Sequence, residues 1–265
     1  MSVCIVMCTF RKGKVAEAHN LWGDLRVALW SLHSYVPSDV DIHVAWEGPA
    51  EPDLVPNAPN FHYYERPPLP GLADAMNWLV AKTDTDGFVM VPDDAVFTPT
   101  TWTFLMQDLA AIEASPRTKV GLLGCRSNFV VGPQNIRSAN GGRLSRDMRF
   151  YDNESVAVEL PSVFPVIGWF DRAIYEQLGQ FPPGLHWFGD NLYSFDLHQA
   201  NLGTYMSRSY VHHIGARGTK SADNITDIQL AANGIAWLRE NRPDFYATLR
   251  LTNPIVTEIS PEPAS

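Results

Sequence analysis

Two adjacent aspartates follow a run of apolar residues in the segment FVMVPDDAVFTPTTW, where the acids are Asp93 and Asp94. Neighbouring carboxylates repel each other, and burying them is costly. One interpretation is a strand that leaves the core into a polar turn, because Asp and Pro favour turns. The other is a divalent cation site at the end of a strand, since the charge of a bound cation reverses the repulsion.

Two later segments favour the cation interpretation. FGDNLYSFDL places Asp190 at the expected start of a helix, where its carboxylate is either a helix cap or a general base. YVHHIG ends an expected strand on His212 and His213, either of which is a candidate ligand. A carboxylate with an imidazole suits Mn²⁺, with Mg²⁺ as a substitute.

Basic residues near these segments are candidates for phosphate contacts. Arg217 and Lys220 follow the histidines in GARGTKS, which lacks the glycine that a phosphate loop carries directly before its lysine. They are either solvated loop charges or a clamp for a diphosphate. Residues 132–150 form a second basic segment, either a surface excursion or a lid over the donor or an anionic acceptor. It contains Arg137, Arg143, Arg146 and Arg149.

The residues around these motifs predict alternating strands and helices. Apolar runs predict strands at 3–9, 41–46, 61–65, 87–91 and 120–125, and a further strand that ends at 213. Amphipathic stretches predict helices that end before Pro37, begin at Gly71, or cover 172–178, 190–201 and 226–240. This alternation predicts one α/β domain with a mostly parallel central sheet flanked by helices. Ligands bind such sheets at the carboxyl ends of the strands, where Thr9, Glu47 and Asp93 fall.

Composition narrows the class of protein. The chain has 265 residues, is 45% hydrophobic and carries a net charge of −9, which is typical of a globular protein without a broad basic surface for nucleic acid. We expect one domain over 1–257 and a frayed tail over 258–265. Three scattered cysteines, no membrane-length apolar run and no signal peptide lead us to expect a cytoplasmic setting.

The order of these motifs resembles that of the family 2 glycosyltransferases, which have the GT-A fold, from about residue 3 to 221. VCIVMCTFRK is similar to the family's first strand and P-T-Y-N turn, and Glu47 falls at its D-D-G-S turn. LPGLADAMNW is similar to its N-x-G-x-x-x-A-x-N helix, and VPDDAVFTPTTW to its DxD-type motif and T-P-x-x-W. VIGWFDRAIYEQLGQF resembles its acceptor-side segment, Asp190 takes the place of the Asp in E-D, and HHIG matches H-x-G.

The chain departs from the family pattern at four positions. Pro92 stands at the first position of the DxD-type motif, and Gly189 stands where the Glu of E-D is usual. In the first turn, Cys8 replaces Pro and Arg11 replaces Asn.

The resemblance implies a metal-dependent, inverting transfer of a sugar from a nucleotide-diphosphate donor, here taken as a UDP-sugar, to an acceptor hydroxyl. It implies that Asp94 and His213 hold Mn²⁺ or Mg²⁺ and that Asp190 is the general base. The acceptor stays open, with a saccharide or a modified nucleobase in DNA as candidates, and so does the oligomeric state. The residues expected to contact the donor are Thr9, Glu47, Asp74, Asn77, Asp93, Arg217 and Lys220.

Two other functions fit parts of the sequence. A sugar-phosphate nucleotidyltransferase shares the sheet and the metal, but it requires a Gly-rich basic loop after the first strand, which TFRKGK matches poorly. A non-catalytic carbohydrate- or nucleic-acid-binding module on the same fold would not need Asp190. For Asp74 and Asn77, ordinary polarity on a helix surface is the alternative to donor contact. A glycosidase needs two facing carboxylates and no metal, which the nearby histidines disfavour.

Overall fold

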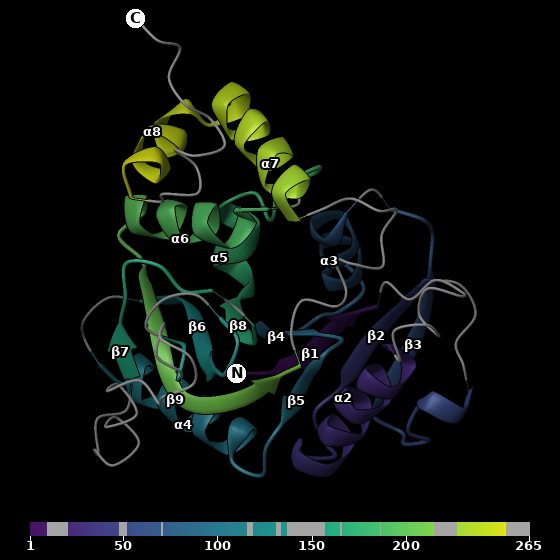
Figure 1. Ribbon diagram of the computed structural model, residues 1–265. Coiled ribbons are helices and arrows are strands. Elements are labelled where there is room, and N and C mark those ends of the chain that lie inside the picture. The colour runs from purple at the N-terminus through teal and green to yellow at the C-terminus, as the bar shows by residue number, and fades with distance from the viewer. Residues whose placement is uncertain are drawn as a thin grey trace, which may run out of the picture.

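A nine-stranded mixed sheet with helices on both faces organises the molecule (Figure 1). The computed structural model describes residues 1–9, 21–47, 52–69, 71–115, 119–130, 134–136, 157–164, 166–185, 187–214 and 227–252. The main path of the sheet runs β3-β2-β1-β4-β8-β6-β9-β5, and β7 pairs with β9. The prediction of a single α/β domain of this class is therefore confirmed.

The first half of the chain builds the parallel part of the sheet. Its strands are β1 (Val3–Cys8), β2 (Ile42–Glu47), β3 (Phe61–Arg66) and β4 (Gly87–Pro92), and the neighbouring pairs among them are parallel. Helix α2 (Leu21–Tyr35) follows β1, and α3 (Leu72–Val80) lies between β3 and β4 in the chain. A short 3₁₀ helix, η1 (Pro52–Leu54), lies between β2 and β3. All four strands coincide closely with the predicted apolar runs.

The second half adds strands that run in both directions. Strand β8 (Gly168–Asp171) lies antiparallel between β4 and β6 (Val120–Ser127), and β6 pairs in parallel with β9 (Gly203–His213). Two three-residue strands, β5 (Ala95–Phe97) and β7 (Ala157–Glu159), pair antiparallel with the two ends of β9. The sequence did not predict β5, β7 or β8, because each is too short to show an alternating pattern.

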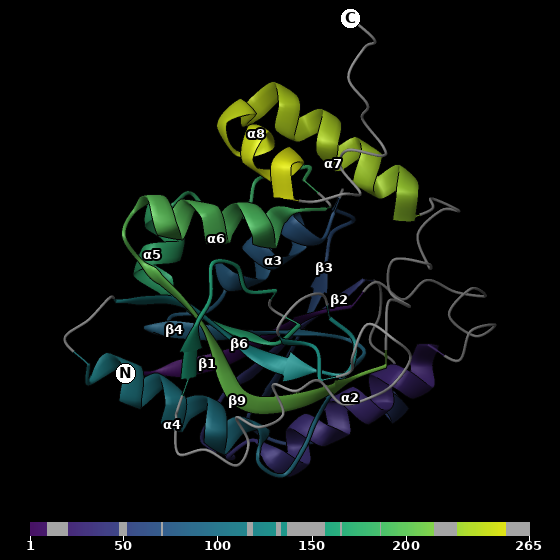
Figure 2. The same cartoon turned by 60° about the vertical axis from the view of Figure 1, so that its left-hand side comes forward.

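Two apolar cores lie on opposite faces of the sheet. Figure 2 shows α2 and α4 (Thr101–Glu113) below the sheet, and α3, α5 (Arg172–Gln177) and α6 (Gly189–Gln199) above it. Successive side chains of β1 alternate between the cores, as in any strand, so its whole run is buried. Ile5 and Met7 enter the first core; Cys4, Val6 and Cys8 enter the second.

A third apolar cluster joins the C-terminal helices to α6. Helices α7 (Asp227–Asn241) and α8 (Pro243–Thr252) lie over α6 in both views (Figures 1 and 2). The buried residues of this cluster are Leu185, Phe188, Leu192, Ala231, Ile235, Leu238, Phe245 and Leu249. Helix α7 was predicted and α8 was not, and the expected tail over 258–265 lies outside the described residues. No described helix is both long and apolar enough to cross a membrane.

Candidate functional site

Asp93 and Asp94 form the turn between β4 and β5. Strand β4 ends at Pro92 and β5 begins at Ala95, so the turn lies at the carboxyl end of a parallel strand. The two residues are only 6% and 4% exposed. This is the edge of the sheet at which open α/β folds bind ligands. The acids are therefore buried at a turn rather than carried away from the core into solvent.

The unpredicted strand β5 brings His213 to Asp94. Ala95 pairs with His213 across the antiparallel β5–β9 ladder, and the backbone amide of Ile214 donates to the carbonyl oxygen of Asp94 at 2.9 Å. The His213 Nε2 atom lies 3.0 Å from Asp94 Oδ1. His212, one residue earlier, is exposed and contacts the Tyr210 hydroxyl instead. Of the two candidate histidines, His213 is thus the one that contacts the acidic turn.

Two neighbours fix the orientation of His213. Its Nδ1 atom lies 2.9 Å from the Phe129 carbonyl oxygen. A carbonyl only accepts, so Nδ1 carries the hydrogen and Nε2 is directed at the carboxylate. The Asn128 side chain accepts from the His213 amide at 2.7 Å and donates to the His213 carbonyl at 3.0 Å. Asn128 was not predicted from the sequence, because no spacing relates it to the histidine.

The Asp94–His213 pair fits a divalent cation. In the structure both ring nitrogens face acceptors, the Phe129 carbonyl oxygen and the Asp94 carboxylate. A cation that replaced the Nε2 proton would meet the Nε2 lone pair and a carboxylate oxygen at one position, and metal-bound histidines commonly have their second nitrogen held by a carbonyl. Burial lowers the pKa of His213, but the hydrogen bond and charge of Asp94 outweigh it and raise the pKa. Among the described residues, Asp93 does not complete a three-ligand cluster with this pair.

Asp190 lies in the first turn of α6 and does not cap it. The N-cap is Phe188, which has φ of 70° and provides no side-chain cap bond, so the capping interpretation of Asp190 is wrong. Its Oδ1 atom accepts from the Asn191 amide at 2.9 Å. Burial raises the pKa of the Asp190 carboxyl to about 6, although hydrogen bonds from backbone amides oppose the shift. A carboxylate with this pKa is suited to accept a proton near neutral pH.

Thr9 follows β1 beside the acidic turn. Cys8 pairs with Pro92, so Thr9 and Asp93 leave adjacent strands at the same level. Thr9 is fully buried, and its hydroxyl has no hydrogen-bond partner among the described residues. Such an unsatisfied buried hydroxyl requires an explanation, and a ligand at this edge of the sheet provides one.

Arg66 also lies at this edge of the sheet, and its position beside Thr9 was not predicted from the sequence. It ends β3 in register with Glu47 at the end of β2, and its Nη2 atom donates to the Thr9 carbonyl oxygen at 3.3 Å. Arg66 is only 3% exposed, which places a guanidinium at the carboxyl ends of these strands. Its position at the end of an apolar strand was the available signal. Only the backbone of Glu47 is among the described parts, so its side chain is not placed.

Asp74 and Asn77 connect α3 to the segment before α6. The Asn77 amide donates to the Phe181 carbonyl oxygen at 2.8 Å and accepts from the Tyr175 hydroxyl. Asp74 Oδ2 accepts from the Gly184 amide at 3.3 Å. Both side chains therefore bridge α3 to the segment before α6. This role differs from the two that the sequence suggested, which were contact with the donor and ordinary polarity on a helix surface. Arg217, Lys220 and the four arginines of 132–150 lie outside the described residues.

The structure is similar to solved glycosyltransferases. GalNAc-T7 with UDP, GalNAc and Mn²⁺ matches with a TM-score of 0.63 and 13% identity, over 95% of this chain and 50% of that one. Staphylococcus aureus TarS 1–349 with UDP-GlcNAc matches at 0.57 and 11%, over 98% and 79%. The mannosyltransferase PcManGT from Pyrobaculum calidifontis, with GDP-Man and Mn²⁺, matches at 0.55 and 16%, over 97% and 73%.

This chain therefore spans half the length of the GalNAc-T7 chain and most of the other two. No protein-family model matches the sequence, and no curated protein matches it. At these identities the likeness concerns the backbone arrangement. The chain has a GT-A-like fold, the fold of the glycosyltransferases to which it is similar.

Proposed function

We propose that the protein is a metal-dependent glycosyltransferase that moves a sugar from a nucleotide-diphosphate donor to an acceptor hydroxyl with inversion. The observation that carries the proposal is the contact of 3.0 Å between Asp94 Oδ1 and His213 Nε2 at the carboxyl edge of a GT-A-like sheet. GalNAc-T7 and PcManGT, which share this fold, hold a nucleotide or nucleotide sugar together with Mn²⁺. We take Mn²⁺, with Mg²⁺ as a substitute, as the ion that Asp94 and His213 hold.

The ion, when bound, offsets the negative charge that develops on the leaving diphosphate. The chain's own residues hold the donor beside it. The unsatisfied Thr9 hydroxyl, the buried Asp93 and the Arg66 guanidinium line the carboxyl ends of β1, β4 and β3. We assign them, with Glu47, to the nucleotide. Arg217 and Lys220 are proposed to contact the diphosphate. GalNAc-T7 and TarS carry UDP or a UDP-sugar, which favours a UDP-sugar as donor.

Asp190 is the proposed general base. Its ionised carboxylate takes the proton from the attacking acceptor hydroxyl, and the acceptor oxygen attacks the anomeric carbon from the side opposite the leaving group. The pKa of about 6 keeps most of the group ionised at neutral pH while retaining basicity. The acceptor is proposed to be a saccharide or a modified nucleobase, and the two are separated by assay with each class.

Neighbouring histidines provide a matched test of the metal assignment. We expect UDP binding measured by calorimetry to require Mn²⁺ in the parent protein, to be lost in His213→Gln and to be unchanged in His212→Gln. Both substitutions remove one imidazole from the end of β9, but only His213 contacts Asp94. If His213→Gln binds UDP in Mn²⁺ with the parental dissociation constant, the assignment of the metal site is wrong.

A further inference from the structure

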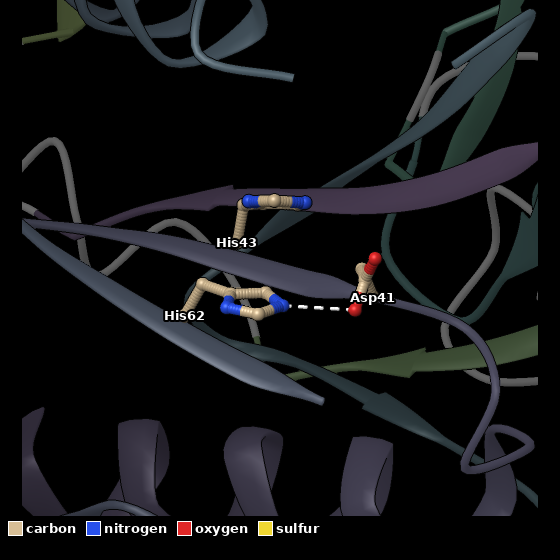
Figure 3. A group of neighbouring side chains, drawn as sticks. All are labelled: Asp41, His43 and His62. Carbon is tan, nitrogen blue, oxygen red and sulfur yellow. Dashed lines mark hydrogen bonds and ion pairs between the residues drawn. The ribbon is translucent and has the colours of Figure 1, made fainter. Parts of the chain in front are cut away.

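Three potential metal ligands meet at the amino end of β2. Among the described residues, Asp41, His43 and His62 form the one group in which three ligand atoms all lie within 4.8 Å of one another. The β2–β3 register pairs His43 directly with His62, and the two imidazoles stack with centroids 4.9 Å apart. His62 Nε2 lies 2.8 Å from Asp41 Oδ1. Figure 3 shows both rings extending from neighbouring strands toward the Asp41 carboxylate.

This cluster is separate from the proposed donor site. Asp41 immediately precedes β2, whereas Glu47 ends it. His43 and Glu47 are four residues apart on the strand, about 13 Å at the usual rise per residue. The three ligands therefore lie toward the amino ends of parallel strands, and Asp94 and His213 lie at the carboxyl edge. Because β3 is an edge strand, the His62 side chain remains 39% exposed and the cluster is open to solvent.

A neighbouring tyrosine orients the more buried histidine. The Tyr64 hydroxyl lies 3.0 Å from His43 Nδ1 and the two rings stack. With Nδ1 engaged by this hydroxyl, Nε2 is the nitrogen left for a cation. Outer hydrogen-bond partners of this kind fix the tautomer of metal-binding histidines.

We propose that Asp41, His43 and His62 form a second cation site, for a divalent transition ion of the zinc type. Two imidazoles and a carboxylate are a common ligand set for Zn²⁺, with water in the remaining position, whereas Mg²⁺ and Ca²⁺ prefer oxygen ligands. Ligand atoms bound to one zinc ion are about 2.9 to 3.4 Å apart. The three ligand atoms lie within 4.8 Å of one another, so the largest separation this allows would have to shorten by about 1.4 Å for all three to bind one ion. The ion links the start of β2 to the edge strand β3.

Calorimetry with ZnCl₂ alone tests this site. Metal-stripped full-length protein carrying His213→Gln is the parent, so that Asp94 and His213 do not contribute a second zinc site. We expect this parent to bind one zinc ion per chain, and the further change His62→Ala or Asp41→Asn to weaken binding at least 100-fold. Tyr64→Phe is expected to weaken it 10- to 100-fold. His33→Ala is the matched control, because His33 is an exposed histidine outside this cluster, with its ring against Trp30 and Phe61.

Two outcomes overturn the proposal. One is parental zinc affinity in both His62→Ala and Asp41→Asn, with folding verified by circular dichroism. The other is zinc binding that leaves the imidazole nitrogen resonances of His43 and His62 unshifted in NMR spectra. In protein with His213 intact, His62→Ala is expected to retain Mn²⁺-dependent UDP binding. This result separates the zinc site from the donor site.

Discussion

At the scale of single residues, the two aspartates that we assign to proton abstraction and to cation binding lie in different surroundings. Asp94 has an imidazole partner at 3.0 Å, whereas burial is the largest influence on the pKa of Asp190. These surroundings separate the two acids chemically even though both are aspartates. A carboxyl group whose pKa is raised by burial is suited to proton transfer. A carboxylate beside an imidazole is suited to binding a cation.

The first residue-scale prediction concerns turnover. Asp190→Asn is expected to lower kcat for transfer by about 100-fold or more while leaving the donor dissociation constant unchanged, because it removes proton abstraction alone. In the parent enzyme, kcat/KM is expected to fall as the pH drops below about 6. Steady-state kinetics over pH 4.5 to 8 measure both effects. Parental turnover in the variant would exclude Asp190 as the base.

The second residue-scale prediction concerns stability. The folded-state pKa of Asp190, about 6, is above the ordinary value of 3.8, so the native state disfavours the ionised carboxylate. The parent therefore loses stability as the pH rises through this window, and the loss is complete above it. Asp190→Asn is expected to stabilise the fold by about 1–3 kcal/mol at pH 7.5 and to have little effect at pH 3.5. Urea unfolding at both values tests this, and an equal effect at both would contradict it.

At the scale of elements, a short antiparallel strand positions the proposed metal ligands. Strand β5 has three residues, yet its pairing with β9 is what brings His213 to the turn that carries Asp94. Asn128, which follows β6, then holds the His213 backbone through two hydrogen bonds. The surroundings of the Asp94–His213 pair are therefore assembled from three strands that are distant in sequence.

Removing the Asn128 amide is expected to loosen this assembly. Asn128→Ala should weaken Mn²⁺-dependent UDP binding by about 10- to 100-fold, as is usual for residues that orient metal ligands, and destabilise the fold by about 1–3 kcal/mol. Asn60→Ala is the control, since its amide donates to the Val40 carbonyl oxygen at the other end of the sheet. Equal losses of UDP affinity in both variants would indicate a general effect on folding.

The elements that the sequence predicted are those with long, uniform patterns. The buried runs of β1 and β4 and the amphipathic faces of α2 and α3 were predictable because each presents a complete apolar strand or helix face. The short strands β5, β7 and β8 form only because β9, β4 and β6 offer free edges, which is information from tertiary structure. The choice between His212 and His213 also depended on the β5–β9 register, and no spacing revealed that Arg66 reaches Thr9.

At the scale of the whole molecule, the C-terminal helices pack on the helix that carries the proposed base. Arg242 connects them to α6 through paired contacts with Asp196 of 2.8 and 2.6 Å. These hydrogen bonds raise the pKa of the Arg242 guanidinium. Helix α8, whose buried Phe245 and Leu249 belong to the third cluster, was not predicted. The collinear order of the motifs was nevertheless enough to predict the GT-A-like fold.

Breaking the Arg242–Asp196 contact is expected to destabilise the protein. Arg242→Gln should reduce the free energy of unfolding by about 1–3 kcal/mol, because it removes two charge-assisted hydrogen bonds to Asp196 and two longer, exposed ones to Asp244. Arg239→Gln, an exposed change in the last turn of α7, is expected to have a smaller effect. Denaturant titration followed by circular dichroism makes the comparison. An identical midpoint for both variants would show that the connection to α6 contributes little.

Helix α7 lies close to the start of α6, so a change in α7 can affect sugar transfer separately from donor binding. A methyl group added at Gly234 would lie 3.0 Å from the Trp187 carbonyl oxygen and 3.2 Å from a Phe188 ring carbon. Phe188 holds its left-handed backbone two residues before Asp190. Gly234→Ala is therefore expected to lower kcat several-fold without changing Mn²⁺-dependent UDP affinity, as measured by kinetics and calorimetry on one preparation. Donor capture would then be a property of the sheet, and transfer a property that the C-terminal helices can modify independently.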